Sequence, residues 1–210
     1  MILSGSILSS VEKGINILKK FNNTTIDYIH LDVMDGKFVN NKSFQMSEIK
    51  KLNDISLKPL DVHLMVKNPE KYIKDLAMLN TLNITFHYEA VKDIDYLIDY
   101  IKSFGIKVGI AINPKTNVNV LNEYLSKIDQ VLVMSVEPGE SGQAFIESTL
   151  EKVKNLKEII NNNNYKTLIE VDGGVNDTNA LSLKECGADI LVSASFIQKD
   201  LDNIKYLREL

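Results

Sequence analysis

The stretch DYIHLDVMDG (residues 27–36) is a largely apolar run that carries His30, Asp32 and Asp35 toward its end. Side chains alternate between the two faces of a strand, so His30, Asp32 and Met34 would share one face. Burying an imidazole and a carboxylate together costs free energy unless a partner satisfies both groups. That partner could be a metal ion, a substrate, or the two side chains themselves.

Seven further short apolar runs follow the same pattern, at residues 2–8, 59–65, 83–88, 107–113, 130–136, 167–174 and 188–195. Longer segments between them carry Leu and Ile at three-to-four spacing among charged residues, for example 68–80, 93–105, 148–160 and 176–189. That spacing is typical of amphipathic helices. Eight strands alternating with eight helices in 210 residues predict an α/β fold, the (β/α)8 barrel, with a doubly wound open sheet as the main alternative.

Polar residues gather toward the carboxyl ends of the predicted strands: His30, Asp32, His63, His87, Asn113, Ser135, Asp172 and Ser195. In a closed barrel these ends converge on one mouth, where barrel enzymes carry their active sites. An open sheet would spread the same residues along a line too long for one site. The placement therefore favours the barrel.

Composition and charge limit the classes of protein to which the chain can belong. Hydrophobic residues make up 44% and charged residues 25% of the chain, which is typical of a soluble globular protein, and we expect one barrel domain over residues 1–210. A net charge of −4 offers no basic patch for nucleic acid. We expect no membrane span and no signal peptide. The single cysteine, Cys186, fits a reducing compartment, so we expect a cytoplasmic protein.

Four of the mouth residues have the chemistry of metal ligands: His30, Asp32, His63 and Asp172. Two imidazoles and two carboxylates suit a divalent ion such as Zn²⁺, Fe²⁺, Mn²⁺ or Co²⁺. The alternative is a set of hydrogen-bonded polar groups at the rim of a barrel. The spacing alone leaves both interpretations open.

Other residues near the mouth have different expected roles. We expect Asp35 and Asp61 to be out of phase with the inward residues of their strands, and each to cap a turn or to pair outside the pore. His87 has no second ligand beside it, so we expect a hydrogen-bonded histidine at the rim rather than a catalytic one. The methionines near the mouth are either core residues or an apolar collar over a substrate: Met34, Met65 and Met134.

Three glycine- and serine-containing stretches predict a phosphate site: EPGESGQAF (137–145), DGGVN (172–176) and SASF (193–196). Glycine lets backbone N–H groups approach an oxyanion, and the start of a helix adds a favourable dipole. The loops after the seventh and eighth strands of a barrel often form such a site. Each stretch alone is a weak signal, but together they favour a phosphorylated ligand.

At this point the sequence resembles the ribulose-phosphate 3-epimerase family, in SGSILS (4–9), IHLDVMDGKFV (29–39), LDVHLMV (60–66), NPE (68–70), FHYEA (86–90), LVMSVEPGESGQAFI (132–146) and IEVDGGVN (169–176). The likeness runs from about Ser4 to Ser195. It implies a (β/α)8 TIM barrel of the ribulose-phosphate-binding type, with one divalent metal cation per subunit and no organic cofactor. It also implies interconversion of D-ribulose 5-phosphate and D-xylulose 5-phosphate in the pentose phosphate pathway.

The resemblance assigns roles to individual residues. The metal ligands fall on the same four residues, and the two acid/base groups fall on Asp32 and Asp172. The substrate contacts fall on Ser6, His63, Gly139, Glu140, Ser141, Gly142, Gly173, Gly174, Ala194 and Ser195. The expected partners are a phosphorylated ketopentose and further copies of the chain in a homo-oligomer.

The chemistry of the implied reaction agrees with these residues. Inverting C3 of a ketose removes a proton next to the C2 carbonyl, and a metal on the carbonyl oxygens would stabilise the resulting enediolate. One carboxylate on each face of this planar intermediate can take a proton and return one. Asp32 and Asp172, on different sides of an eight-stranded mouth, could flank the substrate.

Other functions remain open. The same residues could epimerise a related ketose phosphate such as D-allulose 6-phosphate. A barrel that has lost catalysis could serve as a phosphate-liganded binding protein, although all four predicted metal ligands are present. A barrel aldolase or decarboxylase commonly uses a lysine at the mouth, and no predicted strand ends in one.

The chain departs from the usual family pattern in its predicted phosphate loops. The loop usually written NPGFGGQ is EPGESGQ here, and the usual Gly-Ser after the eighth strand is Ala194-Ser195. Glu137 and Glu140 would repel a phosphate if they pointed inward. We therefore expect them to point outward or to pair with a lysine, for which Lys37 and Lys42 are candidates.

Overall fold

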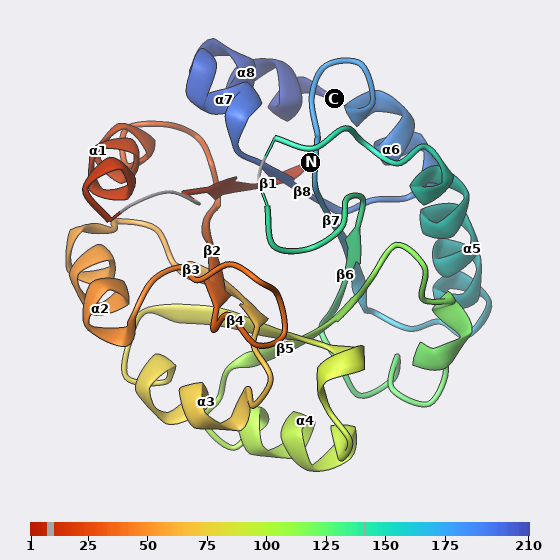
Figure 1. The fold of residues 1–210 in the computed structure, drawn as a ribbon. Helices are drawn as coiled ribbons and strands as arrows, with labels where there is room; N and C mark the ends of the chain where they lie inside the picture. The colour runs from red at the N-terminus through yellow and green to blue at the C-terminus, as the bar shows by residue number, and fades with distance from the viewer. Residues whose placement is uncertain (8–10, 141) are drawn as a thin grey trace.

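A closed barrel of parallel strands forms the centre of the protein in a computed structural model, which describes residues 1–7, 11–140 and 142–210 (Figure 1). Each strand pairs with its neighbours in sequence, and the last strand pairs with the first. The strands are β1 (Ile2–Ser6), β2 (Tyr28–Met34), β3 (Leu60–Met65), β4 (Thr81–His87), β5 (Lys107–Ile112), β6 (Gln130–Met134), β7 (Leu168–Asp172) and β8 (Ile190–Ser193). This closure confirms the predicted (β/α)8 barrel and rules out the open sheet.

Helices surround the barrel on its outside (Figure 1). They are α1 (Val11–Phe21), α2 (Met46–Ile55), α3 (Glu70–Leu76), α4 (Ile94–Lys102), α5 (Ser148–Asn162), α6 (Ala180–Cys186), α7 (Ser195–Lys199) and α8 (Asp202–Glu209). The expected alternation of strand and α-helix is interrupted after β5, where the chain forms only the 3₁₀ helix η2 (Val118–Leu121) before β6. This connection is rich in asparagine and contains Pro114, residues that favour turns over helix. Among the described residues no helix is long and apolar enough to cross a membrane.

The apolar core lies between the barrel and its helices. Leu31 and Val33 of β2 and Leu64 of β3 belong to one buried cluster with Leu18 of α1 and Leu52 of α2. The strands are buried on both faces, as parallel strands covered by helices are. The hydrophobic effect at this outer layer therefore holds the barrel closed.

The inner face of the barrel is different, because many of its buried side chains are polar. Those that hydrogen-bond to one another inside the barrel are Ser4, Ser6, His30, Asp32, Asp61, His63, Asn83, Thr85, His87, Gln130 and Glu170. A small apolar cluster, Ala111, Leu132, Met134 and Val136, lies apart from the outer core. Alternation along β2 and β3 thus directs apolar residues to the helices and polar residues to the interior, whereas the interior faces of β5 and β6 also carry apolar residues.

The amino-terminal ends of β1 and β2 are held by the last helix. Arg208 of α8 donates to both carboxylate oxygens of Asp27, at 2.7 and 2.9 Å, and to the carbonyl oxygens of Met1 and Thr25. Asp27 Oδ2 also accepts a hydrogen bond from the backbone N–H of Leu3 in β1, at 2.9 Å. This bidentate pair fixes α8 against the start of the barrel.

Gly109 on β5 gives a test of this polar interior. A side-chain carbon at this position would overlap the Thr85 hydroxyl and lie 3.0 Å from Gln130 Cγ. Asn83 and Gln130 both donate to that hydroxyl, so Thr85 cannot move without losing these hydrogen bonds. We expect Gly109→Ala to lower the free energy of unfolding by about 1–3 kcal/mol, measured by urea denaturation.

Gly14 in α1 is the matched control, because a carbon added there would meet its nearest neighbour, Leu52 Cδ2, at an ordinary 3.6 Å. Gly14→Ala should raise the free energy of unfolding by up to about 1 kcal/mol, since alanine favours helix over glycine. Equal stability of the two variants would show that the interior at Gly109 is looser than described.

Candidate functional site

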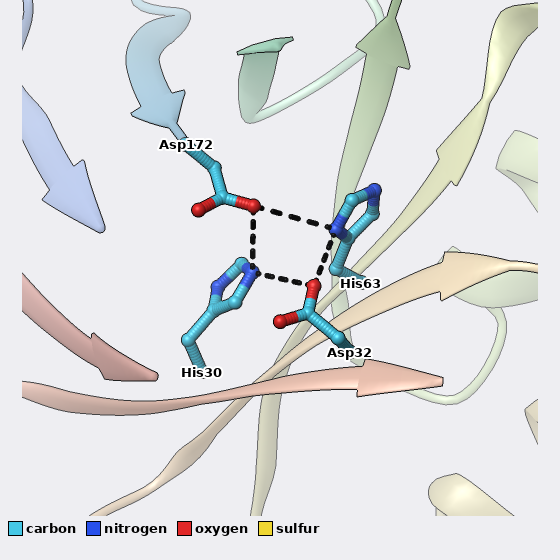
Figure 2. A group of neighbouring side chains, drawn as sticks. All are labelled: His30, Asp32, His63 and Asp172. Atoms are coloured by element: carbon cyan, nitrogen blue, oxygen red, sulfur yellow. Dashed lines mark hydrogen bonds and ion pairs between the residues drawn. The ribbon is translucent and has the colours of Figure 1, made fainter. Parts of the chain in front are cut away.

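The four predicted metal ligands meet at the carboxyl end of the barrel. His30 and Asp32 lie on β2, His63 is the register partner of Asp32 on β3, and Asp172 ends β7. Figure 2 shows their side chains converging from different strands. His63 Nδ1 lies 2.9 Å and His30 Nε2 lies 3.4 Å from Asp32 Oδ1, while Asp172 Oδ2 lies 3.8 Å from His30 Nε2 and 3.9 Å from His63 Nδ1.

These four atoms have the spacing of ligands around a small cation. Metal–ligand bonds of 2.0–2.1 Å in a tetrahedron place neighbouring ligand atoms about 3.3 Å apart, and the observed separations lie on both sides of that value. His30 Nε2 is buried and has no hydrogen-bond partner among the described residues. An unpaired nitrogen facing two carboxylates is a suitable ligand for a cation, so the cluster could hold a divalent metal.

The electrostatics of the cluster also favour positive charge at this point. Burial opposes protonation of His30, but the charges of Asp32 and Asp61 raise its pKa well above the usual range. Burial and the charge of Asp32 raise the pKa of Asp172 to about 7. Burial also raises the pKa of Asp32, but His30 and His63 more than reverse this and hold it well below the usual range. The two carboxylates therefore differ in proton affinity.

The pKa of His63 shifts in the opposite direction to that of His30. Burial is the main cause that lowers the pKa of His63 to about 4, and the neighbouring His87 and His30 lower it further, against the effect of Asp32. His63 is therefore neutral near pH 7. A neutral imidazole is the form that binds a metal.

Asp61 lies inside the barrel, so the expectation of a turn cap or a position outside the pore is wrong. It is 2% exposed, and its Oδ2 lies 2.8 Å from both Ser4 Oγ and His30 Nδ1. Asp61 and His63 are two residues apart in one strand and therefore share a face. Asp61 holds the ring of His30 by the nitrogen opposite the metal cluster, as a carboxylate commonly does for a metal-binding histidine.

Glu170 is a buried carboxyl group that the sequence patterns did not single out. Its Oε2 accepts a hydrogen bond from Gln130 Nε2 at 2.6 Å, and its Oε1 lies 3.9 Å from His30 Nδ1. Burial and the charge of Asp61 raise its pKa well above the usual range, which favours its protonated form. Glu170 lies two residues before Asp172 on β7, so the alternation of side chains along a strand already indicated that the two share the inner face. His30, Asp61 and Glu170 form a second group whose atoms lie close enough to share a cation or protons.

His87 is hydrogen-bonded, as expected, but it is buried rather than at the rim. It is 0% exposed, and its Nε2 lies 2.8 Å from His63 Nε2. Its Nδ1 lies 3.3 Å from Glu89 Oε2, at the start of η1 (Tyr88–Ala90). Burial raises the pKa of Glu89, but hydrogen bonds from His87, Thr116 and Asn113 lower it to about 2. Neither contact of His87 was predicted.

A cavity of about 200 Å³ opens beside the metal cluster at the mouth. Its walls include most of the predicted substrate contacts: Ser6, Gly139, Glu140, Gly142, Gly173, Gly174, Ala194 and Ser195. Asp32 and Asp172 also line it, whereas His63 does not. Ser141 lies outside the described residues. The three methionines, Met34, Met65 and Met134, line the cavity as well, which agrees with an apolar collar over a ligand.

The backbone after β7 is shaped by two glycines. Gly173 and Gly174 have φ values of 121° and 65°, and a side-chain carbon at Gly173 would lie 2.5 Å from Val136 Cγ2. Ser135 Oγ donates to the carbonyl oxygens of Asp172 and Gly173, at 2.8 and 2.6 Å. These contacts fix the end of β7 and with it the position of the Asp172 side chain.

One of the two acidic residues in the loop after β6 forms an ion pair with a lysine. Glu137 is exposed and lies 3.3 Å from Lys115 Nζ, so its partner is neither Lys37 nor Lys42. Glu140 is exposed at the edge of the cavity. The loop is also joined across the mouth, because Asn41 Nδ2 donates to the carbonyl oxygen of Gly139 at 2.9 Å.

Asp35 has the structural role expected of it. Its Oδ1 accepts hydrogen bonds from the backbone N–H groups of Lys37 and Phe38, and its Oδ2 accepts one from Lys67. It therefore caps the turn after β2. It also connects that turn to the loop after β3.

Comparison with known proteins agrees with this geometry. The sequence matches the Ribulose-phosphate 3 epimerase family over residues 2–198. A Helicobacter pylori (strain J99) protein named ribulose-phosphate 3-epimerase is 41% identical over 176 residues, which cover 84% of this chain and 81% of that protein. A Bacillus subtilis protein of the same name is 38% identical over 207 residues, covering 98% of this chain and 91% of that protein.

Solved structures show the same fold at low sequence identity. A 3-hexulose-6-phosphate synthase structure superposes with a TM-score of 0.70 at 16% identity, covering 100% of this chain and 98% of that chain. At that identity the likeness concerns the barrel alone. The family match and the close relatives go further, and they show that this chain belongs to the ribulose-phosphate 3-epimerase family.

Proposed function

We propose that this protein is a metal-dependent epimerase that inverts C3 of D-ribulose 5-phosphate to give D-xylulose 5-phosphate in the pentose phosphate pathway. The observation that carries the proposal is the pair of carboxylates, Asp32 and Asp172, which line one cavity from β2 and β7. Inversion at a carbon needs an acid and a base on opposite faces, and two separate strands can supply them. The names of the relatives support the same activity.

The sugar phosphate would bind in the cavity beside the metal cluster. The backbone N–H groups around Gly173-Gly174 and Ala194-Ser195 would hold its phosphate, because glycine permits close approach and anions favour such sites. Met34, Met65 and Met134 would cover the carbon chain. The cavity of about 200 Å³ admits a small substrate.

The residues of the chain would move protons at C3. Asp32, whose pKa is held low, would take the C3 proton, and Asp172, whose pKa is raised to about 7, would return one on the other face. In the reverse direction the two roles exchange. A cation bound by His30, Asp32, His63 and Asp172 would supply electrostatic stabilisation of the enediolate, as a Lewis acid. Zn²⁺, Fe²⁺, Mn²⁺ and Co²⁺ suit these donors, and no organic cofactor is needed.

A related ketose phosphate, D-allulose 6-phosphate, is the second candidate substrate, because Glu140 and Ala194 line the cavity at positions that differ from the usual family pattern. Steady-state assays of the metal-loaded protein with both sugars test this choice. We expect kcat/KM for ribulose 5-phosphate to exceed that for allulose 6-phosphate by more than about tenfold, or about 1.4 kcal/mol. The reverse order would assign the protein to the larger sugar. No turnover of either would contradict the proposal.

The metal site gives a direct prediction. Replacing His63 by alanine removes one of four ligands, so stoichiometric metal binding and nearly all epimerase activity should be lost. His30→Ala should have the same effect, with an added cost to stability because Asp61 loses one of its hydrogen-bond partners. Metal content by elemental analysis, with circular dichroism to confirm folding, checks both variants. Full metal occupancy in either one would show that the four-ligand site is wrong.

The two-carboxylate scheme predicts a separation of two activities. Asp32→Asn and Asp172→Asn should each abolish net epimerisation, because inversion needs both faces. One of the two should still exchange the C3 proton with solvent, since a single base suffices for that step. Incorporation of deuterium from heavy water, followed by NMR beside the epimerase assay, measures both. Near-normal epimerisation by either variant would rule out this scheme.

A further inference from the structure

A row of buried contacts leads away from the metal cluster through His63. His63 Nε2, on the side of the ring opposite Asp32, lies 2.8 Å from His87 Nε2. His87 Nδ1 in turn lies 3.3 Å from Glu89 Oε2. The two imidazole rings are fully buried and stacked, with centroids 5.0 Å apart. We call His63, His87 and Glu89 the histidine row.

Glu89 is fixed at the outer end of this row. Its other oxygen, Oε1, accepts a hydrogen bond from the backbone N–H of Asn113 at 2.9 Å and another from the Thr116 hydroxyl. These donors lie on the segment after β5. The carboxylate therefore presents only Oε2 to His87, and a carboxylate can only accept a hydrogen bond.

When both rings are neutral, Glu89 favours one placement of the proton on each of them. Facing a carboxylate, His87 holds its proton on Nδ1, which leaves Nε2 as an acceptor. His63 must then carry its proton on Nε2 in order to donate to His87. His63 Nδ1, which lies 2.9 Å from Asp32 Oδ1, then carries a lone pair that a cation at the cluster would bind. Without a cation, Asp32 competes with His87 for the proton of His63, but the same Asp32 oxygen also lies 3.4 Å from His30 Nε2, which is a second group able to face it.

The alternative placement of the proton would obstruct the metal cluster. A proton on His63 Nδ1 would hydrogen-bond to Asp32 Oδ1, and a cation would have to displace it. We propose that His87 and Glu89 are positioning residues that hold the proton of His63 on Nε2 and so keep Nδ1 available to the cation. This inference rests on the proposed metal site, but it concerns the tautomer of His63, which is measurable without metal.

The variant Glu89→Gln tests the row, because its new amide has a defined orientation. The Asn113 N–H and the Thr116 hydroxyl require the amide oxygen at the Oε1 position, so the amide nitrogen would replace Oε2 and donate to His87 Nδ1. His87 would then donate from Nε2, and the proton of His63 would move to Nδ1. Side-chain shape is nearly unchanged, so we expect the variant to fold.

Two measurements decide the outcome. The chain has three histidines, so nitrogen-15 NMR of the metal-free protein can assign each imidazole tautomer. We expect His63 to carry its proton on Nε2 in the unmodified protein and on Nδ1 in Glu89→Gln. Competition with a zinc chelator should show a roughly 10- to 100-fold higher Kd for Zn²⁺ in the variant, the range typical of lost support to a ligand.

Glu137→Gln is the matched control, since it removes the same charge from an exposed carboxylate near the same end of the barrel. Its Kd for Zn²⁺ should change less than about twofold, because exposed charges are screened. If both variants lost affinity for Zn²⁺ equally, the effect of Glu89→Gln would be explained by the change in net charge alone, and the proposal would be overturned. An unmodified protein with its His63 proton on Nδ1, or a Glu89→Gln variant with unchanged tautomer and Kd, would also overturn it. If the unmodified protein bound no Zn²⁺, the proposed metal site would be wrong. The tautomer of His63 in the two proteins would still test whether Glu89 controls its proton.

Discussion

Burial of charge inside the barrel is the constraint on which the rest of the structure depends. Asp32, Asp61, Glu170 and Asp172 lie within reach of one histidine, His30, in an interior that excludes most water. Four ionised carboxylates could not remain together there, because each would be costly to desolvate and would repel the others. The pKa values of His30, Asp172 and Glu170 are all raised, which favours their protonated forms and limits this repulsion. A divalent cation would serve the same purpose at one point of the cluster.

This interior gives the barrel little hydrophobic stabilisation, so closure depends on the layer between the strands and the helices. The same alternation that directs Leu31 and Val33 outward directs His30 and Asp32 inward. A slip of β2 by one residue would bury two apolar side chains in the polar interior and place the ligands against the helices. The apolar core therefore specifies the site as well as the fold.

The sequence was sufficient for the barrel and for the convergence of the four candidate ligands, because both follow from local patterns: apolar runs, helical spacing, and polar residues at strand ends. It was not sufficient for contacts that depend on which strands become neighbours. Asp61 was assigned to the wrong face although its spacing from His63 already contained the answer. The contact of His87 with His63 depends on side-chain rotamers, and that of Glu137 with Lys115 depends on how two loops fold. No local pattern encodes either.

The pairing of β1 with β8 has a consequence for synthesis of the chain on the ribosome. β1 is synthesised long before its partner β8 and before the arginine that holds Asp27. Until those residues leave the exit tunnel, one edge of β1 and one edge of β7 have no strand beside them. Open parallel edges expose backbone groups that can pair with other chains. A nascent chain that still lacks β8 is therefore prone to aggregation through these two edges.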